Sequence, residues 1–201
     1  PYVALIQAFG QALQTLATEG AERTPAKGQV VALATGRGFN IESAHIVSAQ
    51  SEINATGAIG WDGQADLQVS FKSAEMSEVQ SVIDSFGFIP TDIKDQYEIA
   101  VTGTGSFEGR LQGKIGAPNL SGLLKISSIK LHDETLGSLE GHIAYSQTLV
   151  RVENGAIIRP DNSRADFTLN APLDDKNKVA LKAVFREFDL PDIVKLAAPG
   201  L

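Results

Sequence analysis

Residues 51–72 read SEINATGAIGWDGQADLQVSFK, and apolar and polar side chains alternate on both sides of a short turn-like segment. Ile53 and Ile59 share one parity in the first half, as Leu67 and Phe71 do in the second half. Because successive side chains of a strand point to opposite faces, the pattern predicts two strands joined by the turn WDGQ. The following residues, 73–83, place apolar side chains three and four apart, which predicts a short amphipathic helix.

A second stretch, residues 165–196, has the same order of strand, turn, strand and helix. Phe71 corresponds to Phe185 and Met76 to Leu190 at a single offset (185 − 71 = 114). A repeated supersecondary unit is typical of proteins that grow by adding similar units along one direction. We therefore expect a repeat protein.

The composition limits the classes of function. The chain of 201 residues carries 17 Lys and Arg against 24 Asp and Glu, for a formal net charge of -7. This balance argues against nucleic acid as a partner, because phosphate binding needs a basic surface. Cysteine is absent, which excludes disulfides and thiolate metal sites. No run of about 18 apolar residues is present, so we expect no membrane-spanning helix.

The longest alternation in the chain covers residues 97–115, where one parity is apolar or glycine. A hairpin turn near Glu108–Arg110 is compatible with that parity, and we expect one there. Further on, the alternation that includes Ile126 resumes at Ile129 on the opposite parity. One extra residue at Ser127–Ser128 accounts for this slip, which predicts a β-bulge.

The remaining segments complete the expected organisation. The stretch VVALATGRGFNIESAHIVSAQ predicts two short strands with a break at Gly36–Gly38. Residues 1–201 are expected to be a single segment of a longer repeat protein, with a helix at 1–18, a first β unit with its closing helix at 28–86, and a second β unit with its closing helix at 95–198.

The apolar residues of these strands indicate how the sheet is used. Most are modest in size, and glycine or alanine often stands where a β-sandwich has a large core anchor. A sheet that curls along its length with no second sheet closing on it leaves an apolar trough. Exposed apolar patches of several hundred Å2 are normally binding sites, and a long dry trough suits an extended apolar chain such as a lipid acyl tail.

The residues at 109–122 read GRLQGKIGAPNLSG, and those at 136–141 read LGSLEG. Together with LLKISSIKL at 123–131 and the closing DLPDIVKLAA, they resemble the TamB/AsmA-like superfamily of translocation and assembly module proteins. The resemblance covers roughly residues 36–198. It implies an all-β fold: an elongated, curled antiparallel β-sheet, called a β-taco, of repeated strand–turn–strand units with a few short α-helices.

The resemblance also implies a place and a role. The parent protein would lie in the bacterial periplasm, anchored in the inner membrane and reaching toward the outer membrane. Its groove would shield phospholipid acyl chains during transport between the membranes, assist the assembly of outer-membrane proteins, or both. An outer-membrane assembly protein would be a partner, bound through parts of the parent that this chain lacks. No cofactor is implied.

The expected lipid-binding residues are those of the apolar parity. They are Ile53, Ile59, Leu67, Val69, Phe71, Ile99, Val101, Phe107, Leu111, Phe167, Leu169, Val179, Leu181 and Phe185. From spacing alone, an ordinary buried core explains such residues better than a ligand groove does. The resemblance favours the groove, because core and groove are then one surface.

Other candidate sites have simpler explanations. GTGSFEG at 103–109 lacks the full spacing of a nucleotide loop, and its glycines suit a bending sheet. The cluster of His132, Asp133 and Glu134 could hold a metal but is typical of a solvated turn, so we expect no metal site. Paired carboxylates at 174–175 and at 189 and 192 suit a turn and a helix start. No nucleophile lies beside a base, so we expect no enzyme.

Two further hypotheses remain open. The chain could be a non-catalytic structural or adhesive β-repeat module whose own sheets close a core. It could also hold unfolded outer-membrane strands at an open edge by β-augmentation, and the sequence does not separate this role from lipid binding.

Overall fold

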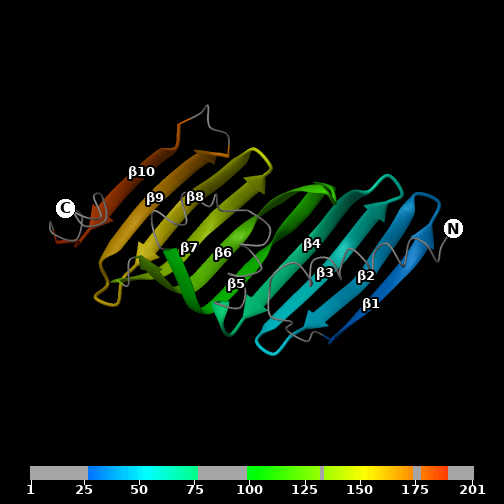
Figure 1. Ribbon diagram of the computed structural model, residues 1–201, viewed down its shortest axis with the longest axis horizontal. Coiled ribbons are helices and arrows are strands. Elements are labelled where there is room, and N and C mark those ends of the chain that lie inside the picture. Colours follow the sequence, from blue (N-terminus) through cyan, green and yellow to red (C-terminus); the bar gives the residue numbers. More distant parts are fainter. Residues whose placement is uncertain (1–26, 77–98, 132–133, 174–177, 190–201) are drawn as a thin grey trace.

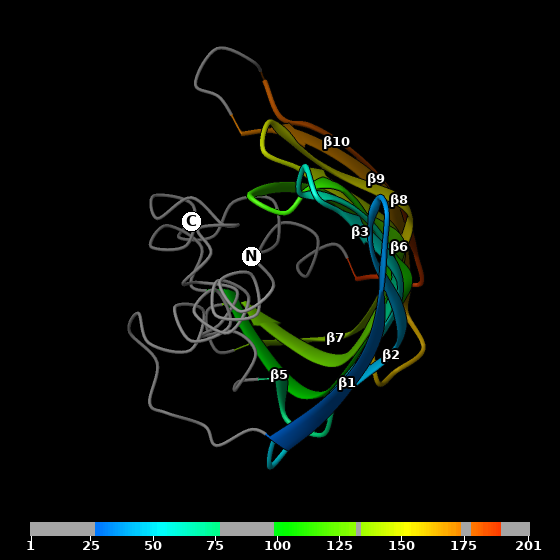
Figure 2. The same cartoon turned by 90° about the vertical axis from the view of Figure 1, so that its right-hand side faces the viewer.

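The computed structural model describes residues 27–76, 99–131, 134–173 and 178–189, which form one antiparallel sheet of ten strands (Figure 1). The strands are β1 (Lys27–Thr35), β2 (Gly38–Val47), β3 (Ser51–Gly60), β4 (Gln64–Ser73), β5 (Ile99–Lys114), β6 (Ala117–Leu131), β7 (Glu134–Ser146), β8 (Leu149–Ile158), β9 (Arg164–Pro172) and β10 (Ala180–Arg186). Each strand pairs with the next along the chain, so the order in the sheet is the order in sequence. The sheet is elongated and weakly curved (Figure 2).

The strands expected on both sides of each turn are present. The break at Gly36–Gly38 separates β1 from β2, and the WDGQ turn separates β3 from β4. In that turn Gly63 has a φ of 78° and its N–H donates to the carbonyl of Gly60 at 3.0 Å, a conformation that glycine adopts without strain. The Trp61 ring packs edge-on against the Phe39 ring, with centroids 4.8 Å apart, and so covers the end of the hairpin.

The predicted bulge at Ser127–Ser128 is confirmed. Ile126 pairs with Leu139 and Ile129 pairs with Gly137, so three steps along β6 match two along β7. The extra residue returns Ile129 to the face of Ile126. Without it every later side chain of β6 would point to the opposite face.

The predicted hairpin near Glu108–Arg110 is wrong. β5 runs for 16 residues without a break, and its second half pairs with β4 on one side and β6 on the other. Leu111, for example, lies between Leu67 and Leu120. A single strand keeps the side-chain parity as well as a tight hairpin does. Side-chain parity therefore does not distinguish a single strand from a hairpin. The pairing of β5 with both neighbouring strands does.

The repeated hairpins agree in face and differ in register. Ile53 pairs with Phe71 between β3 and β4, whereas Phe167, the counterpart of Ile53, pairs with Ala183 instead of Phe185. The shift is two residues, which is the side-chain period of a strand, so each apolar side chain stays on the same face. The pairing of β4 with β5 also makes the sheet continuous between the two expected β units. Of the helix expected over 73–83, Ser73 belongs to β4, and residues 77–83 lie outside the described residues, as do the helices expected at 1–18 and over 190–196.

Candidate functional site: the apolar face of the sheet

One face of the sheet is apolar across all ten strands. The strand register lines up one residue from each strand, and every one is aliphatic or glycine. In the order β1 to β10 this row, named here the long apolar row, is Val30, Ala44, Ala55, Val69, Gly109, Gly122, Ile143, Val152, Leu169 and Leu181. Cross-strand neighbours stand close enough for their side chains to touch, so the row is a continuous apolar strip.

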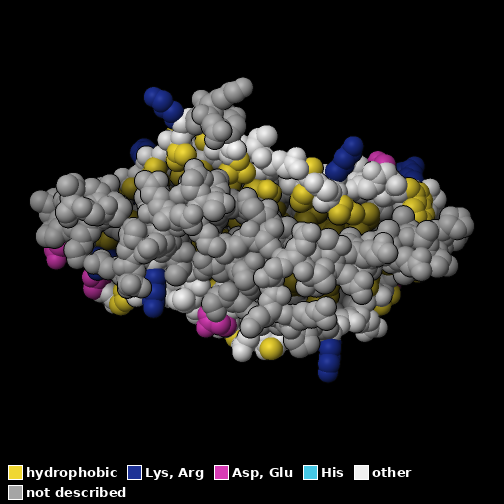
Figure 3. Space-filling view, viewed as in Figure 1, with side chains coloured by type: hydrophobic (Ala, Val, Ile, Leu, Met, Phe, Trp, Pro, Cys, Tyr) yellow, Lys and Arg dark blue, Asp and Glu magenta, His cyan; other side chains and the backbone are white. Residues whose placement is uncertain are grey.

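The neighbouring row on the other face differs in chemistry. From β3 to β10 it consists of Thr56, Gln68, Arg110, Ser121, Ala144, Arg151, Asn170 and Ala180. No member is a large hydrophobic residue. We call the two sides the apolar face and the polar face. Figure 3 shows hydrophobic side chains in patches on the side turned to the viewer, where grey atoms do not cover it.

The register brings the predicted lipid-binding residues together on the apolar face. Eleven follow from the pairings: Ile53, Ile59, Leu67, Val69, Phe71, Phe107, Leu111, Phe167, Leu169, Leu181 and Phe185. Val101 joins them beside Ile129 of β6, and the backbone of Ile99 pairs with that of Leu131. Val179 differs, because it precedes β10 and lies outside the ladder.

Glycines on the apolar face receive the rings of two phenylalanines. A methyl group built on Gly155 would come within 2.6 Å of the Phe167 ring, and one on Gly122 within 2.7 Å of the Phe107 ring. Both distances are below van der Waals contact, so each ring lies directly over the glycine. The rings therefore lie against the sheet and do not project from it, which keeps the apolar face smooth.

Burial on the apolar face is partial. Ile41, Phe107 and Ile126 are buried, whereas Leu181 remains 65% exposed. Among the described residues no large side chain is fully buried, and no second sheet packs on this one. A closed β-sandwich of similar size has many fully buried side chains between its two layers. Within the described part of the chain, the apolar face is thus not the interior of a sandwich.

A hollow of about 210 Å3 lies at the β8–β10 end of this face. Its lining is mainly apolar and includes Ile157, Phe167, Leu181 and Phe185. Phe188 follows β10 and contacts the Phe185 ring edge-on, with centroids 5.3 Å apart, while the Arg159 guanidinium lies 5.5 Å from the Phe188 ring. This end of the apolar face is therefore hollowed.

The sequence-based selection missed a large part of the apolar face. The omitted members on the middle strands include Leu120, Leu124, Ile126, Ile143, Tyr145, Val150 and Val152, and Leu136 and Phe188 line the hollow. The alternation of β6 to β8 carries the same parity signal and could have found the first seven. Phe188 lies beyond the end of β10, so no alternation marks it.

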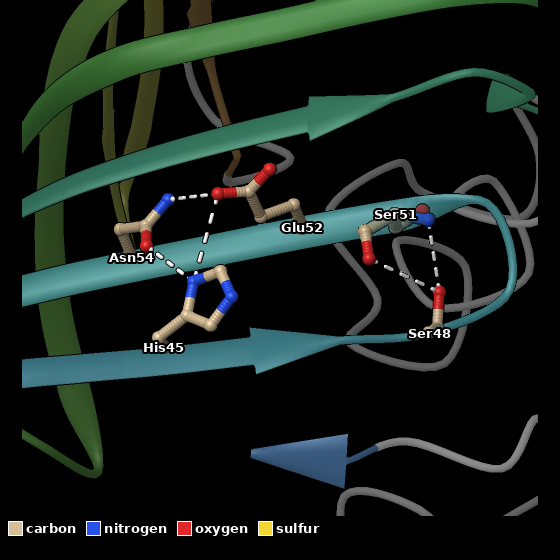
Figure 4. A network of polar contacts seen from close by, with 5 residues as sticks. All are labelled: His45, Ser48, Ser51, Glu52 and Asn54. Carbon is tan, nitrogen blue, oxygen red and sulfur yellow. Dashed lines mark hydrogen bonds and ion pairs between the residues drawn. The ribbon is translucent and has the colours of Figure 1, made fainter. Parts of the chain in front are cut away.

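The polar face carries clusters of a different kind. His45 Nδ1 lies 2.7 Å from Asn54 Oδ1 and 3.6 Å from Glu52 Oε1, and Asn54 Nδ2 donates to Glu52 Oε1 at 2.9 Å (Figure 4). Because the amide oxygen only accepts, Nδ1 carries the proton in this arrangement. In the adjoining turn the Ser51 N–H donates to Ser48 Oγ at 3.0 Å. These contacts fix the β2–β3 hairpin in the way that cross-strand polar pairs generally do.

Ion pairs across strands continue this pattern. Arg110 donates two hydrogen bonds to Asp66, at 2.6 and 2.7 Å, which together with its charge lower the pKa of the Asp66 carboxyl. Near the β8–β9 turn, the hydroxyl and the N–H of Ser163 donate to Asp161 and lower the pKa of that carboxyl. Both carboxylates are exposed and held in the charged form, which suits a solvated face.

The other sequence candidates are placed as follows. GTGSFEG at 103–109 lies inside β5, so no helix N-terminus follows it to receive a phosphate. Residues 132–133, 174–175 and 192 lie outside the described residues. Within the described ranges no group of three His, Asp or Glu side chains is arranged to hold a metal ion, and no helix is long and apolar enough to cross a membrane.

The fold and the face together define a class: an all-β protein built on one elongated antiparallel sheet with an apolar and a polar side. Comparisons with protein families, with curated proteins and with solved structures return no match.

Proposed function

We propose that this chain is a segment of a TamB/AsmA-like protein of the bacterial envelope. Its sheet curls into a groove whose apolar face shields lipid acyl chains in the periplasm, for phospholipid transport between the membranes or for assembly of outer-membrane proteins. The observation that carries the proposal is the long apolar row, which continues through ten strands without a polar residue.

The length of the row supports an extended ligand. Ten strands give nine inter-strand spacings of about 4.8 Å, so the row follows the sheet for roughly 43 Å. An acyl chain extends about 15 Å, half of the hydrocarbon core of a bilayer. The row therefore accommodates more than one tail end to end, as a conduit requires and a single-ligand pocket does not.

The chemistry of the row supports passive sliding. Each CH2 group removed from water contributes about 0.8 kcal/mol, so a tail is held firmly as a whole. Neighbouring positions along the row are chemically alike, and the glycines under Phe107 and Phe167 keep those rings low. A step along the row thus changes the binding free energy little. Direction must come from another component.

Photo-crosslinking in cells tests the proposal in the full-length parent. A photoreactive residue is placed at Phe71 or Phe185 on the apolar face, or at the adjacent Lys72 or Arg186 on the polar face, and the adducts are identified by mass spectrometry. We expect lipid adducts at the two phenylalanine positions only. Adducts with polypeptide instead of lipid at these positions would favour protein assembly, and crosslinks only within the chain would indicate a structural module with a closed core.

A charge on the apolar face gives a second test. Leu181→Asp places a carboxylate in the long apolar row at a side chain that is already 65% exposed, so the fold should survive. Ala180→Asp is the matched control, because it makes the same charge change one residue away on the polar face. We expect Leu181→Asp to lower the co-purified lipid per protein several-fold and Ala180→Asp to leave it unchanged. Equal lipid content in the two variants would count against the apolar face as the binding surface.

A further inference from the structure

The outer edge of β1 is an accessible strand edge. Among the described strands β1 pairs with β2 alone, and all nine of its residues are exposed. Their apolar side chains point to both faces: Val30 on the apolar face is 44% exposed, and Val31 and Leu33 on the polar face are 36% and 54% exposed. An edge of this kind presents a row of N–H and C=O groups, and the natural complement of that row is another strand.

Apart from Lys27 at its first position, β1 lacks the features that usually protect an edge strand. Residues 28–35 contain no charged residue and no proline. The irregularity in its pairing places the extra residue in β2, because Val31 pairs with Ser43 and Ala32 with Ile41. Natural edge strands commonly carry charges, prolines or bulges that prevent pairing. Their absence over residues 28–35 indicates an edge that is used.

The opposite edge of the sheet differs. β10 carries Lys182 and Arg186 on its polar side, and Arg186 forms an ion pair with Asp166 at 3.0 Å. Directly after it, Glu187 has a φ of 59° and the chain leaves the strand direction. Charges and an abrupt end are typical edge protection. The two edges are therefore not equivalent, and β1 is the one suited to pairing.

We propose that β1 pairs antiparallel with β1 of a second copy of this chain, about a two-fold axis perpendicular to the sheet and centred on Val31. In this register the whole of β1 pairs, because Lys27 faces Thr35 of the second copy. No like charges face each other. Val30 faces Ala32 of the second copy on the apolar face, and Gln29 faces Leu33 on the polar face. The two-fold axis leaves the apolar faces of the two copies on the same side, so the two sheets join into one continuous sheet.

A second copy suits this edge better than an arbitrary strand. A two-fold pairing is self-complementary, and such closed dimers are the commonest protein oligomers. It sets Val31 against its own counterpart and Leu33 against the uncharged Gln29, whereas a strand with charges on its polar side would leave these two apolar side chains beside charged groups. The dimer goes beyond the proposed groove function, because it does not depend on what the apolar face binds.

Sedimentation velocity of the full chain over a range of concentrations tests the pairing. Val31→Lys combined with Leu33→Lys puts two charges on the edge at exposed positions, and circular dichroism verifies that the fold is retained. Val184→Lys is the matched control on the polar side of β10. We expect a wild-type dimer, a dissociation constant raised at least tenfold in the β1 variant, and no change in the β10 variant.

The chain contains no cysteine, which permits a test of the register. Val31→Cys places two thiols directly opposite each other across the two-fold, within reach of a disulfide, whereas Leu33→Cys faces Gln29. We expect mild oxidation to crosslink the first variant as a dimer and not the second. Three results would each overturn the proposal. The chain could be a monomer at all concentrations, or its dimer could survive the two lysines in β1. It could also grow into larger assemblies that Val184→Lys weakens as well.

Discussion

The contact between Phe167 and Gly155 leads to a prediction about how the apolar face is built. A methyl group on Gly155 would meet three atoms of the Phe167 ring at 2.6 to 2.8 Å, and these are the nearest atoms around it. Gly155→Ala therefore has to displace the ring. Forcing an extra methyl group into a packed site costs about 1 to 3 kcal/mol, partly offset by about 0.4 to 1 kcal/mol from the reduced freedom of the unfolded chain. We expect a net loss of about 1 kcal/mol in the free energy of unfolding.

The reasoning is tested by a double-mutant cycle. Phe167→Leu removes the ring atoms that lie over Gly155, so the added methyl group no longer meets them. We expect Gly155→Ala to be neutral or stabilising in that background, with a coupling energy of at least about 1 kcal/mol. Urea unfolding followed by circular dichroism, with linear extrapolation to water, measures all four free energies.

Gly36→Ala is the control for this cycle. A methyl group on Gly36, in the turn between β1 and β2, meets nothing within 4 Å. We expect no destabilisation from it, and additivity with Phe167→Leu within about 0.5 kcal/mol. Additive effects of Gly155→Ala and Phe167→Leu would refute the inference that the ring lies over the glycine.

Two further predictions concern the centre of the sheet and its polar face. Phe107→Ala removes a ring that is only 7% exposed and uncovers Gly122. We expect it to lower the free energy of unfolding, measured with urea, by about 3 to 5 kcal/mol. Ile53→Ala, at an exposed apolar position, should lower it far less. Asp66 has a pKa lowered by Arg110, so its ion pair contributes stability above the usual carboxyl pKa of about 4, and that contribution disappears as the pH falls through the lower folded-state pKa. The difference in stability between the wild type and Asp66→Asn should be constant from about pH 5 to 8 and shrink below about pH 4. A difference that shrinks near neutral pH would contradict the assignment to Asp66.

Local pattern was sufficient for most of the strands, β5 excepted, and for the face on which their side chains lie. The parity of Ile53 and Leu67, the turn at WDGQ and the slip at Ser127–Ser128 all follow from neighbours within a few residues, and the structure agrees with each. The reason is that the side-chain period of a strand is a property of its own backbone. It requires no knowledge of the partner strand.

The register lies beyond such local information. Asp66 meets Arg110 across 44 positions of sequence, and the Phe167 ring lies over Gly155 of the neighbouring strand β8. These contacts depend on which strands pair and on which residues stand opposite each other. The two-residue difference between the β3–β4 and β9–β10 hairpins, whose sequences match in parity, illustrates the limit.

The sequence by itself therefore determined an all-β chain with one apolar side on its strands. Only the tertiary structure decided that the strands form one sheet in sequence order, that β5 is unbroken, and that the apolar residues align into a row across ten strands. The physical reason is that alternation is set within each strand, whereas alignment is set by hydrogen bonds and side-chain contacts between strands that are distant in the chain.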